Sequence, residues 1–246
     1  MHPHKSMQPT TATRHYFSQP NVVKHYTRVA EEGIYPFETR LLASCGLEIP
    51  GCRGLDVGCG PGRLGIALNQ KGGTMIGMDI APAMLFANSC LGTPRGTSFL
   101  PLVAADASCM PFRRSSFDLL LATHNFLGHL TTQDQRIAFF KEAARVLHPE
   151  GSLLISCHLQ DRNVHGPSVD CTCWIQEPFA PGATLPFYFF SQETLHKEFS
   201  LAQLRLVACH PIQTLSQPGE IVPWHPSTHF FHLQVAATDS KPGYQR

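Results

Sequence analysis

Short apolar runs alternate with amphipathic stretches over the middle of the chain. Five of the runs have the length and composition of buried strands, at 54–57, 74–79, 100–104, 116–123 and 151–156. Apolar residues recur at helical spacing in three of the stretches between them, at 64–70, 82–88 and 133–147. Strands that alternate with helices in this order predict an α/β fold with a parallel sheet and right-handed crossovers.

The N-terminal part, residues 1–50, departs from this alternation. Residues 1 to about 14 are rich in His, Pro, Thr and Gln and are expected to form a loose tail. A turn and then a helix with an aromatic face are predicted within 16–26, and a second helix is predicted over 36–43.

The C-terminal part combines an insertion with ordinary helix and strand patterns. Residues 161–184 are dense in Pro, Gly, Cys and His and are too long for a simple connector, so a functional loop is predicted within an insertion of about 158–190. Its aromatic residues could cover an organic ligand or anchor the loop to the core: Trp174, Phe179, Phe187 and Tyr188. A helix over 191–199 and strands over 204–208 and 230–237 follow.

The first predicted strand leads into a glycine-rich turn, Asp-Val-Gly-Cys-Gly-Pro-Gly, which begins at Asp56. Glycine at every second position lets the backbone take positive φ and lets a ligand lie directly on it, near the positive end of the following helix. A dinucleotide fingerprint would need glycine where Arg63 stands, so a nicotinamide dehydrogenase ranks last among the functions considered. The carboxylate of Asp56 would repel a pyrophosphate but suits a cationic ligand.

The turn and the segments after it resemble the class I S-adenosylmethionine-dependent methyltransferases over roughly 54–155. The turn has the form of the family's first motif, and Asp79 stands where the second motif carries its ribose-binding acid. The segment Asp-Ala-Ser-Cys-Met-Pro-Phe, which begins at Asp106, is similar to the family's adenine-binding segment. The resemblance implies a Rossmann-like, seven-stranded, mostly parallel sheet with an antiparallel C-terminal strand pair and helices on both faces. It also implies a methyltransferase domain over 51–240, preceded by N-terminal lid helices.

The resemblance further implies S-adenosylmethionine as the cofactor. Asp56 and the turn would hold its amino-acid end, Asp79 its ribose and Asp106 its adenine amino group. An alternative for Asp79 is the N-cap of the helix over 82–88. Tyr16 of the lid could touch the ligand or pack a helix onto the core. The residues expected at the cofactor are Asp56, Gly58, Cys59, Gly60, Gly62, Asp79, Ile80, Asp106, Ala107, His124 and Tyr16.

The fourth predicted strand ends in His-Asn-Phe-Leu-Gly-His, residues 124–129. Ligands in open α/β sheets bind beyond the carboxyl ends of the strands, so this segment is expected to border both cofactor and acceptor. His124, Asn125 and His129 are therefore the candidate catalytic residues, with a histidine as base for a hydroxyl or thiol. His129 could instead pack the next helix, since methyl transfer from a sulfonium can need little beyond alignment.

Composition narrows the classes of function. The chain of 246 residues is 43% hydrophobic and 15% charged, which is enough to bury one substantial core. Its net charge is +1 and it has no long Lys/Arg run, so a nucleic-acid substrate is disfavoured. The polar first residues, and the absence of an apolar run of ~20 residues, predict a cytoplasmic protein without membrane association, in an oligomeric state that stays open.

Cysteine and histidine patterns give no sign of cross-links or metal. The nine cysteines are scattered and odd in number, so they are interpreted as reduced apolar fillers. The histidines form no His-Glu-x-x-His pattern, and Cys171 and Cys173 are separated by one residue where structural zinc sites have two to four. No bound metal is therefore expected.

The function predicted from these observations is methyl transfer from S-adenosylmethionine to an O, N, S or C atom of a small organic molecule. Aromatic residues near the lid and the lack of a basic patch favour a small acceptor, which would enter between the N-terminal helices and 161–190. Two alternatives stay open: a cofactor-binding protein without methyl transfer, and an enzyme that uses the cofactor for a rearrangement or cyclisation without methylation.

Overall fold

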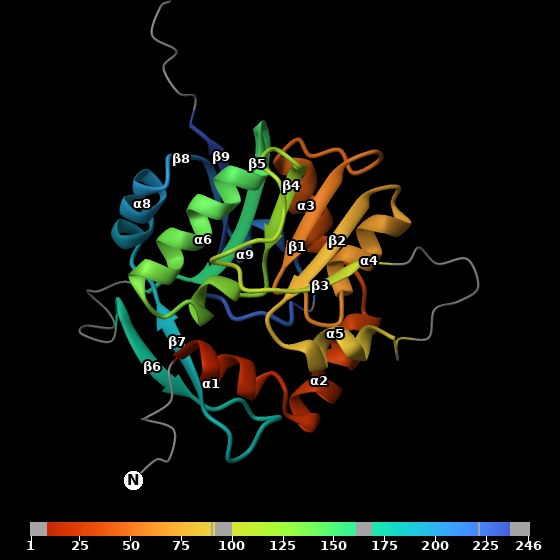
Figure 1. Ribbon diagram of the computed structural model, residues 1–246, viewed down its shortest axis with the longest axis vertical. Coiled ribbons are helices and arrows are strands. Elements are labelled where there is room, and N and C mark those ends of the chain that lie inside the picture. The colour runs from red at the N-terminus through yellow and green to blue at the C-terminus, as the bar shows by residue number, and fades with distance from the viewer. Residues whose placement is uncertain (1–8, 90, 92–99, 161–168, 221, 237–246) are drawn as a thin grey trace, which may run out of the picture.

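The computed structural model describes residues 9–89, 91, 100–160, 169–220 and 222–236. A seven-stranded sheet forms the centre of the molecule (Figure 1). Its strands are β1 (Arg53–Val57), β2 (Thr74–Asp79), β3 (Leu102–Ala104), β4 (Phe117–Ala122), β5 (Leu147–His158), β8 (Leu204–Pro211) and β9 (Thr228–Val235). Predictions for residues 1–8 and 161–168, and for the end of the last strand at 237, lie outside the described residues.

The strand order is β3-β2-β1-β4-β5-β9-β8. Strands β1 to β5 pair in parallel, and β9 runs antiparallel between β5 and β8. The predicted α/β class, with seven strands and an antiparallel C-terminal pair, is therefore confirmed. The chain order reverses between β1 and β4, which is the place where open α/β sheets bind ligands.

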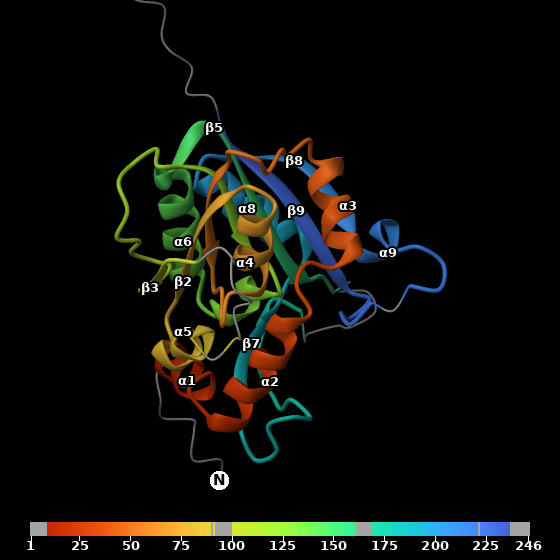
Figure 2. The same cartoon turned by 90° about the vertical axis from the view of Figure 1, so that its right-hand side faces the viewer.

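Helices cover both faces of the sheet and the carboxyl ends of its strands (Figures 1 and 2). They are α1 (Pro9–Tyr16), α2 (Pro20–Glu31), α3 (Pro36–Ser44), α4 (Arg63–Gln70), α5 (Pro82–Asn88), the 3-10 helix η1 (Phe126–His129), α6 (Gln133–Val146), α8 (Gln192–Leu201) and α9 (Ile212–Leu215). Proline opens α2, α3 and α5 at the first turn, where a missing N–H costs no helical hydrogen bond. None of the helices in the described ranges combines the length and the hydropathy of a membrane span, and the longest, α6, has 14 residues.

Each face of the sheet packs against its own apolar cluster. On one face, Phe139 and Phe140 of α6 and Phe199 of α8 pack against alternate residues of the central strands, including Leu120. On the other face, α3, α4 and α9 pack against the intervening residues, such as Leu121 of β4. Because successive residues of a strand point to opposite faces, the continuous apolar runs of the sequence serve both clusters.

Residues 9–14 correct the predicted N-terminal tail. They belong to α1, which lies with α2 beside the carboxyl ends of the strands (Figures 1 and 2). Ala12 is buried, and Gln135 of α6 donates a hydrogen bond to Thr10. A helix this short is marginal in water, so it depends on such tertiary contacts, and its own sequence carried little signal.

The predicted insertion loop is also corrected. β6 (Cys171–Ile175) and β7 (Leu185–Phe189) pair as an antiparallel hairpin outside the main sheet. Phe187 is 4% exposed and faces Gly128, whereas Trp174 is 37% exposed. Phe187 thus supports the anchoring alternative for the aromatic residues of this segment.

The start of β5 differs from the sequence expectation as well. The sequence predicted a helix up to residue 147 and a strand that begins at 151. Instead, β5 already begins at Leu147, because Leu147 pairs with Phe117 of β4.

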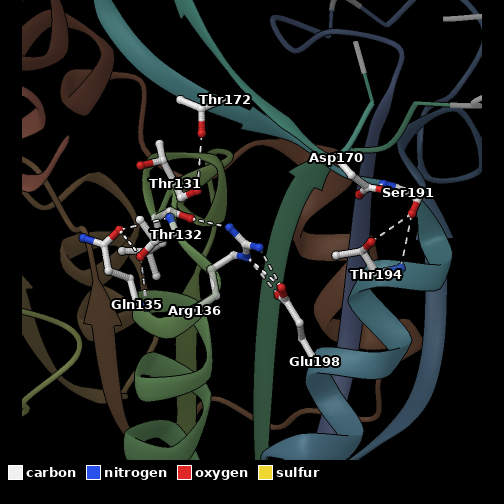
Figure 3. Close-up of polar contacts among 10 residues, drawn as sticks. Thr131, Thr132, Gln135, Arg136, Asp170, Thr172, Ser191, Thr194 and Glu198 are labelled. Carbon is white, nitrogen blue, oxygen red and sulfur yellow. Dashed lines mark hydrogen bonds and ion pairs between the residues drawn. The ribbon is translucent and has the colours of Figure 1, made fainter. Parts of the chain in front are cut away.

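A buried ion pair joins α6, α8 and the hairpin. The guanidinium of Arg136 donates to both carboxylate oxygens of Glu198, with N–O distances of 2.7–3.1 Å, and also to the Leu130 carbonyl (Figure 3). The Tyr188 ring lies 4.0 Å from the guanidinium carbon. Thr172 of β6 donates to the Thr131 carbonyl (Figure 3). These contacts fix the hairpin against the segment that carries η1.

Candidate active site

A cavity lies beyond the carboxyl ends of the central strands. Its walls come from the glycine-rich turn after β1, the end of β2, the segment after β3, the end of β4 with η1, and helices α1 and α2. Of the residues singled out from the sequence, those that line it are Asp56, Gly58, Cys59, Gly60, Asp79, Ile80, Asp106, Ala107, His124 and His129. Segments far apart in the sequence thus meet at one place.

Three residues singled out from the sequence lie outside the cavity lining. Gly62 is the N-cap of α4, with φ 98°. Asn125 follows His124, and its N–H donates to the Ser156 hydroxyl at 2.8 Å. Tyr16 is 1% exposed and packs in the cluster beneath α1 and α2, which agrees with the core-packing alternative.

The glycine-rich turn has the left-handed backbone that its sequence suggested. Gly58 and Gly60 have φ of 68° and 55°, where a side chain would introduce strain. A Cβ on Gly58 would lie 2.4 Å from the Phe126 ring, whereas one on Gly60 would meet no atom within 4 Å. The turn therefore leaves backbone open to the cavity.

Asp56 is a buried carboxyl at the start of this turn. Its Oδ2 accepts a hydrogen bond from the Gly65 N–H at 3.2 Å. Burial raises the pKa of Asp56 to about 7, although the nearby Arg63 and the Gly65 N–H both act to lower it. A cation at this position would favour the ionised form.

Asp79 ends β2 and is tied to the turn. Its Oδ2 accepts from the Gly60 N–H at 2.9 Å, and its Oδ1 accepts from the Ala81 N–H at 2.8 Å. Ala81 is the N-cap of α5 and no side chain caps that helix, so the N-cap alternative for Asp79 is wrong. Since each carboxylate oxygen has two lone pairs, both oxygens can accept a further hydrogen bond.

Asp106 follows β3 and lines the same cavity. Its Oδ1 accepts from the N–H and the hydroxyl of Ser108 at 2.8 and 2.7 Å. These bonds hold the carboxyl in a fixed orientation. Ala107 beside it adds an apolar surface to the cavity.

The end of β4 has an unusual backbone. His124 and Asn125 have φ of 57° and 58°, which costs non-glycine residues roughly 1–3 kcal/mol each. The His124 ring meets Trp224 edge-on at 4.9 Å and Tyr26 at 5.7 Å. Burial, aided by Arg63, lowers the pKa of His124 to about 3. This histidine is therefore neutral at physiological pH.

His129 ends η1 and is held between two aromatic rings. Phe17, from the segment between α1 and α2, and Phe187 of β7 both lie 5.1 Å away and meet it edge-on. Burial lowers the pKa of His129 to about 4, and its Nδ1 is a buried atom without a hydrogen-bond partner in the protein. Such an atom calls for a ligand or water.

Several site residues were not identified from the sequence. Phe17 lies in the aromatic segment predicted near the N-terminus, but nothing marked it above its neighbours. Thr13 lines the cavity from what was expected to be a tail. Trp224 reaches His124 from an irregular segment far along the chain, and no local pattern could have placed it there.

The polar groups of the cavity suit a nucleoside that carries a cationic amino-acid group better than they suit a metal ion. Acids stand at three places along the cavity, and the glycine-rich turn supplies exposed backbone between Asp56 and Asp79. Within the described residues, His, Cys, Asp and Glu do not gather in groups of three or more that could hold a metal ion.

Comparison with known proteins agrees with this arrangement. A family profile described as a methyltransferase domain matches residues 55–155. An uncharacterized protein of Mycobacterium tuberculosis is 30% identical over 128 residues, which are 52% of this chain and 44% of that protein. The aklanonic acid methyltransferase DauC of a Streptomyces species is 31% identical over 105 residues, 42% of this chain and 47% of that protein. The chain thus spans less than half of these curated relatives.

Solved structures extend the likeness to the whole fold. A crystal structure of a Methanosarcina mazei protein, named as a SAM-dependent methyltransferase, has a TM-score of 0.65 and covers 84% of this chain and 100% of its own. At 19% identity this likeness is one of fold. Residues 55–155 are thus a methyltransferase domain, within a chain that has the fold of the S-adenosylmethionine-dependent methyltransferases.

Proposed function

We propose that this protein transfers a methyl group from S-adenosylmethionine to a nucleophilic atom of a small organic molecule. The observation that carries the proposal is the meeting of Asp56, Asp79 and Asp106 with the open glycine-rich turn in one cavity, which His129 also borders. Such an arrangement serves the reaction by holding donor and acceptor in line and excluding water.

The three acids would divide the cofactor between them. Asp56 would accept a hydrogen bond from its ammonium group. Asp79 would accept hydrogen bonds from both ribose hydroxyls, because each of its carboxylate oxygens keeps a free lone pair. Asp106, held by Ser108, would accept from the adenine amino group. When bound, the cofactor supplies an electrophilic methyl carbon, so the protein's own task is alignment.

A small acceptor is favoured over a macromolecule. Phe17 and Tyr26 line the cavity from the segment between α1 and α2 and from α2, and would lie beside the acceptor. The name of the Streptomyces relative gives aklanonic acid, a small molecule, as its substrate. A cytoplasmic location stays a prediction from the sequence.

Calorimetric titration tests the cofactor assignment. Wild-type protein, Asp79→Ala and Glu193→Ala are titrated with S-adenosylmethionine and with its demethylated product, S-adenosylhomocysteine. Glu193 is an exposed acid of α8 and serves as the matched control. We expect micromolar binding to the wild type and the control, and at least tenfold weaker binding to Asp79→Ala. Wild-type protein that binds neither ligand would contradict the proposal.

A further inference from the structure

Beyond the acids of the cofactor end, the cavity continues between aromatic rings and two histidines. We propose that the acceptor is an uncharged, hydroxylated aromatic compound, and that the proton of its hydroxyl passes to His129. This inference rests on the proposed methyl transfer and specifies the substrate class of that same cavity.

Aromatic side chains supply the walls of this part of the cavity. Phe17, Tyr26 and Phe126 all line it, together with His124 and His129. Each of these rings can pack edge-on or offset against a further ring, an arrangement worth more than its buried area alone. The lining therefore suits an aromatic acceptor better than a flexible polar one.

The charged side chains of the lining disfavour an anionic acceptor. Among the described residues that line the cavity, the charged ones are three acids and Arg63. Arg63 is already bonded to Glu38 and to the Gly33 carbonyl. A carboxylate or phosphate would therefore find no free cation among these side chains, and in protein loaded with S-adenosylhomocysteine, which lacks the sulfonium charge, it would be buried unpaired at a strong cost. An uncharged hydroxyl meets no such penalty.

His129 is the better proton acceptor of the two histidines. Burial lowers the pKa of both histidines, and the positive charge of Arg63 further opposes protonation of His124, whereas no arginine acts on His129 in this way. The edge-on contacts with Phe17 and Phe187 also hold the His129 ring in one place. A fixed, neutral imidazole is ready to accept a hydrogen bond from a hydroxyl.

The proposed step balances in atoms and charge. A lone pair of the acceptor oxygen forms the new O–C bond to the methyl carbon. The C–S bond breaks, and its electron pair stays on sulfur. The hydroxyl proton goes to His129, so one positive charge disappears from sulfur as another appears on the imidazole. Loss of the sulfonium charge makes the protonated histidine easier to sustain.

This assignment places part of acceptor selection outside the matched domain. Phe187 lies in the hairpin, beyond residues 55–155, and Phe17 lies before them. Both rings contact His129. Phe187 therefore fixes the position of a histidine that the domain itself provides, whereas Phe17 both contacts that histidine and lines the cavity.

The test uses binding rather than turnover. Protein saturated with S-adenosylhomocysteine is titrated calorimetrically with 2-naphthol and with 2-naphthoate, which share a ring system and differ in charge. We expect 2-naphthol to bind at least tenfold more tightly. His129→Gln should weaken 2-naphthol at least fivefold without changing the affinity for S-adenosylhomocysteine, which also reports that the variant is folded. His196→Gln, on the exposed side of α8, is the matched control.

Each other outcome is decisive. Equal or tighter binding of 2-naphthoate, or binding of neither compound to the loaded protein, would overturn the acceptor class. Wild-type affinity for 2-naphthol in His129→Gln would overturn the role of His129, and His129→Asn provides a second variant if the first does not fold. Failure of the wild type to bind S-adenosylhomocysteine would instead contradict the proposed function.

Discussion

Arg63 of α4 and Glu38 of α3 form a buried ion pair with two hydrogen bonds. The N–O distances are 2.7 and 2.5 Å, and the side chains are 8% and 3% exposed. The guanidinium also lies over the Tyr35 ring and donates to the Gly33 carbonyl. The residue that breaks the dinucleotide fingerprint therefore anchors the helix after the glycine-rich turn to the N-terminal helices.

Loss of the negative partner should destabilise the fold. Glu38→Gln leaves the buried Arg63 charge uncompensated, and we expect the free energy of unfolding to fall by about 3 kcal/mol. Chemical denaturation measures the change. Glu31→Gln, an exposed acid at the end of α2, is the control and should change stability by less than about 0.5 kcal/mol. Equal effects of the two substitutions would show that the ion pair contributes little.

The sheet could be predicted because its strands carry their own signal. Leu119, Leu120 and Leu121 are all buried, since a central parallel strand is covered on both faces. The acids were predictable for a related reason, because each stands at the carboxyl end of a strand or within two residues of it. Parallel strands then bring their carboxyl ends, and so Asp56, Asp79 and the segment of Asp106, to one edge.

The acceptor side could not be predicted, because it depends on contacts between distant segments. In the hairpin, half-buried and exposed residues alternate along β6. Strand β7 contains Pro186, and a proline argues against a strand when only the sequence is known. Helix α1 lacks an apolar stripe, and Trp224 lies in an irregular segment. His129 was identified, but its position between two aromatic rings from outside the domain follows from tertiary packing alone.

Cofactor affinity should depend on the ionisation of Asp56. Its pKa of about 7 means that the carboxyl loses its charge as the pH falls below 7, so a bound ammonium loses its partner. From pH 8 to pH 6 the ionised fraction falls about tenfold, and we expect the affinity for S-adenosylmethionine to fall by a similar factor. The same titrations on Asp56→Asn measure the pH dependence that comes from the ligand's own ionisable groups, so that this part can be subtracted. If the affinity of Asp56→Asn changes with pH as that of the wild type does, Asp56 does not have this role.

Acid should destabilise the protein through His158. Burial, together with His225, lowers its pKa to about 4, and its Nδ1 lies 3.0 Å from the Ser227 hydroxyl. Because the unfolded chain takes up this proton near pH 6.5 and the folded one does not, the stabilising contribution is complete above 6.5 and is lost between 6.5 and 4. Relative to His158→Gln, the wild type should lose roughly 2–3 kcal/mol over that range. Denaturation curves at several pH values check this, with His196→Gln expected to follow the wild type.

The contact between Gly128 and Phe187 should be essential for the position of His129. A Cβ at position 128 would lie 2.2 Å from the Phe187 ring, so Gly128→Ala must displace that ring, which packs edge-on against His129. We expect a loss of about 2 kcal/mol in unfolding free energy and weaker binding of 2-naphthol, with unchanged affinity for S-adenosylhomocysteine. In a Phe187→Leu background the same substitution has room, so its cost should drop by more than about 1 kcal/mol. If the stability effects of the two substitutions simply add, Gly128 and Phe187 do not couple η1 to the hairpin.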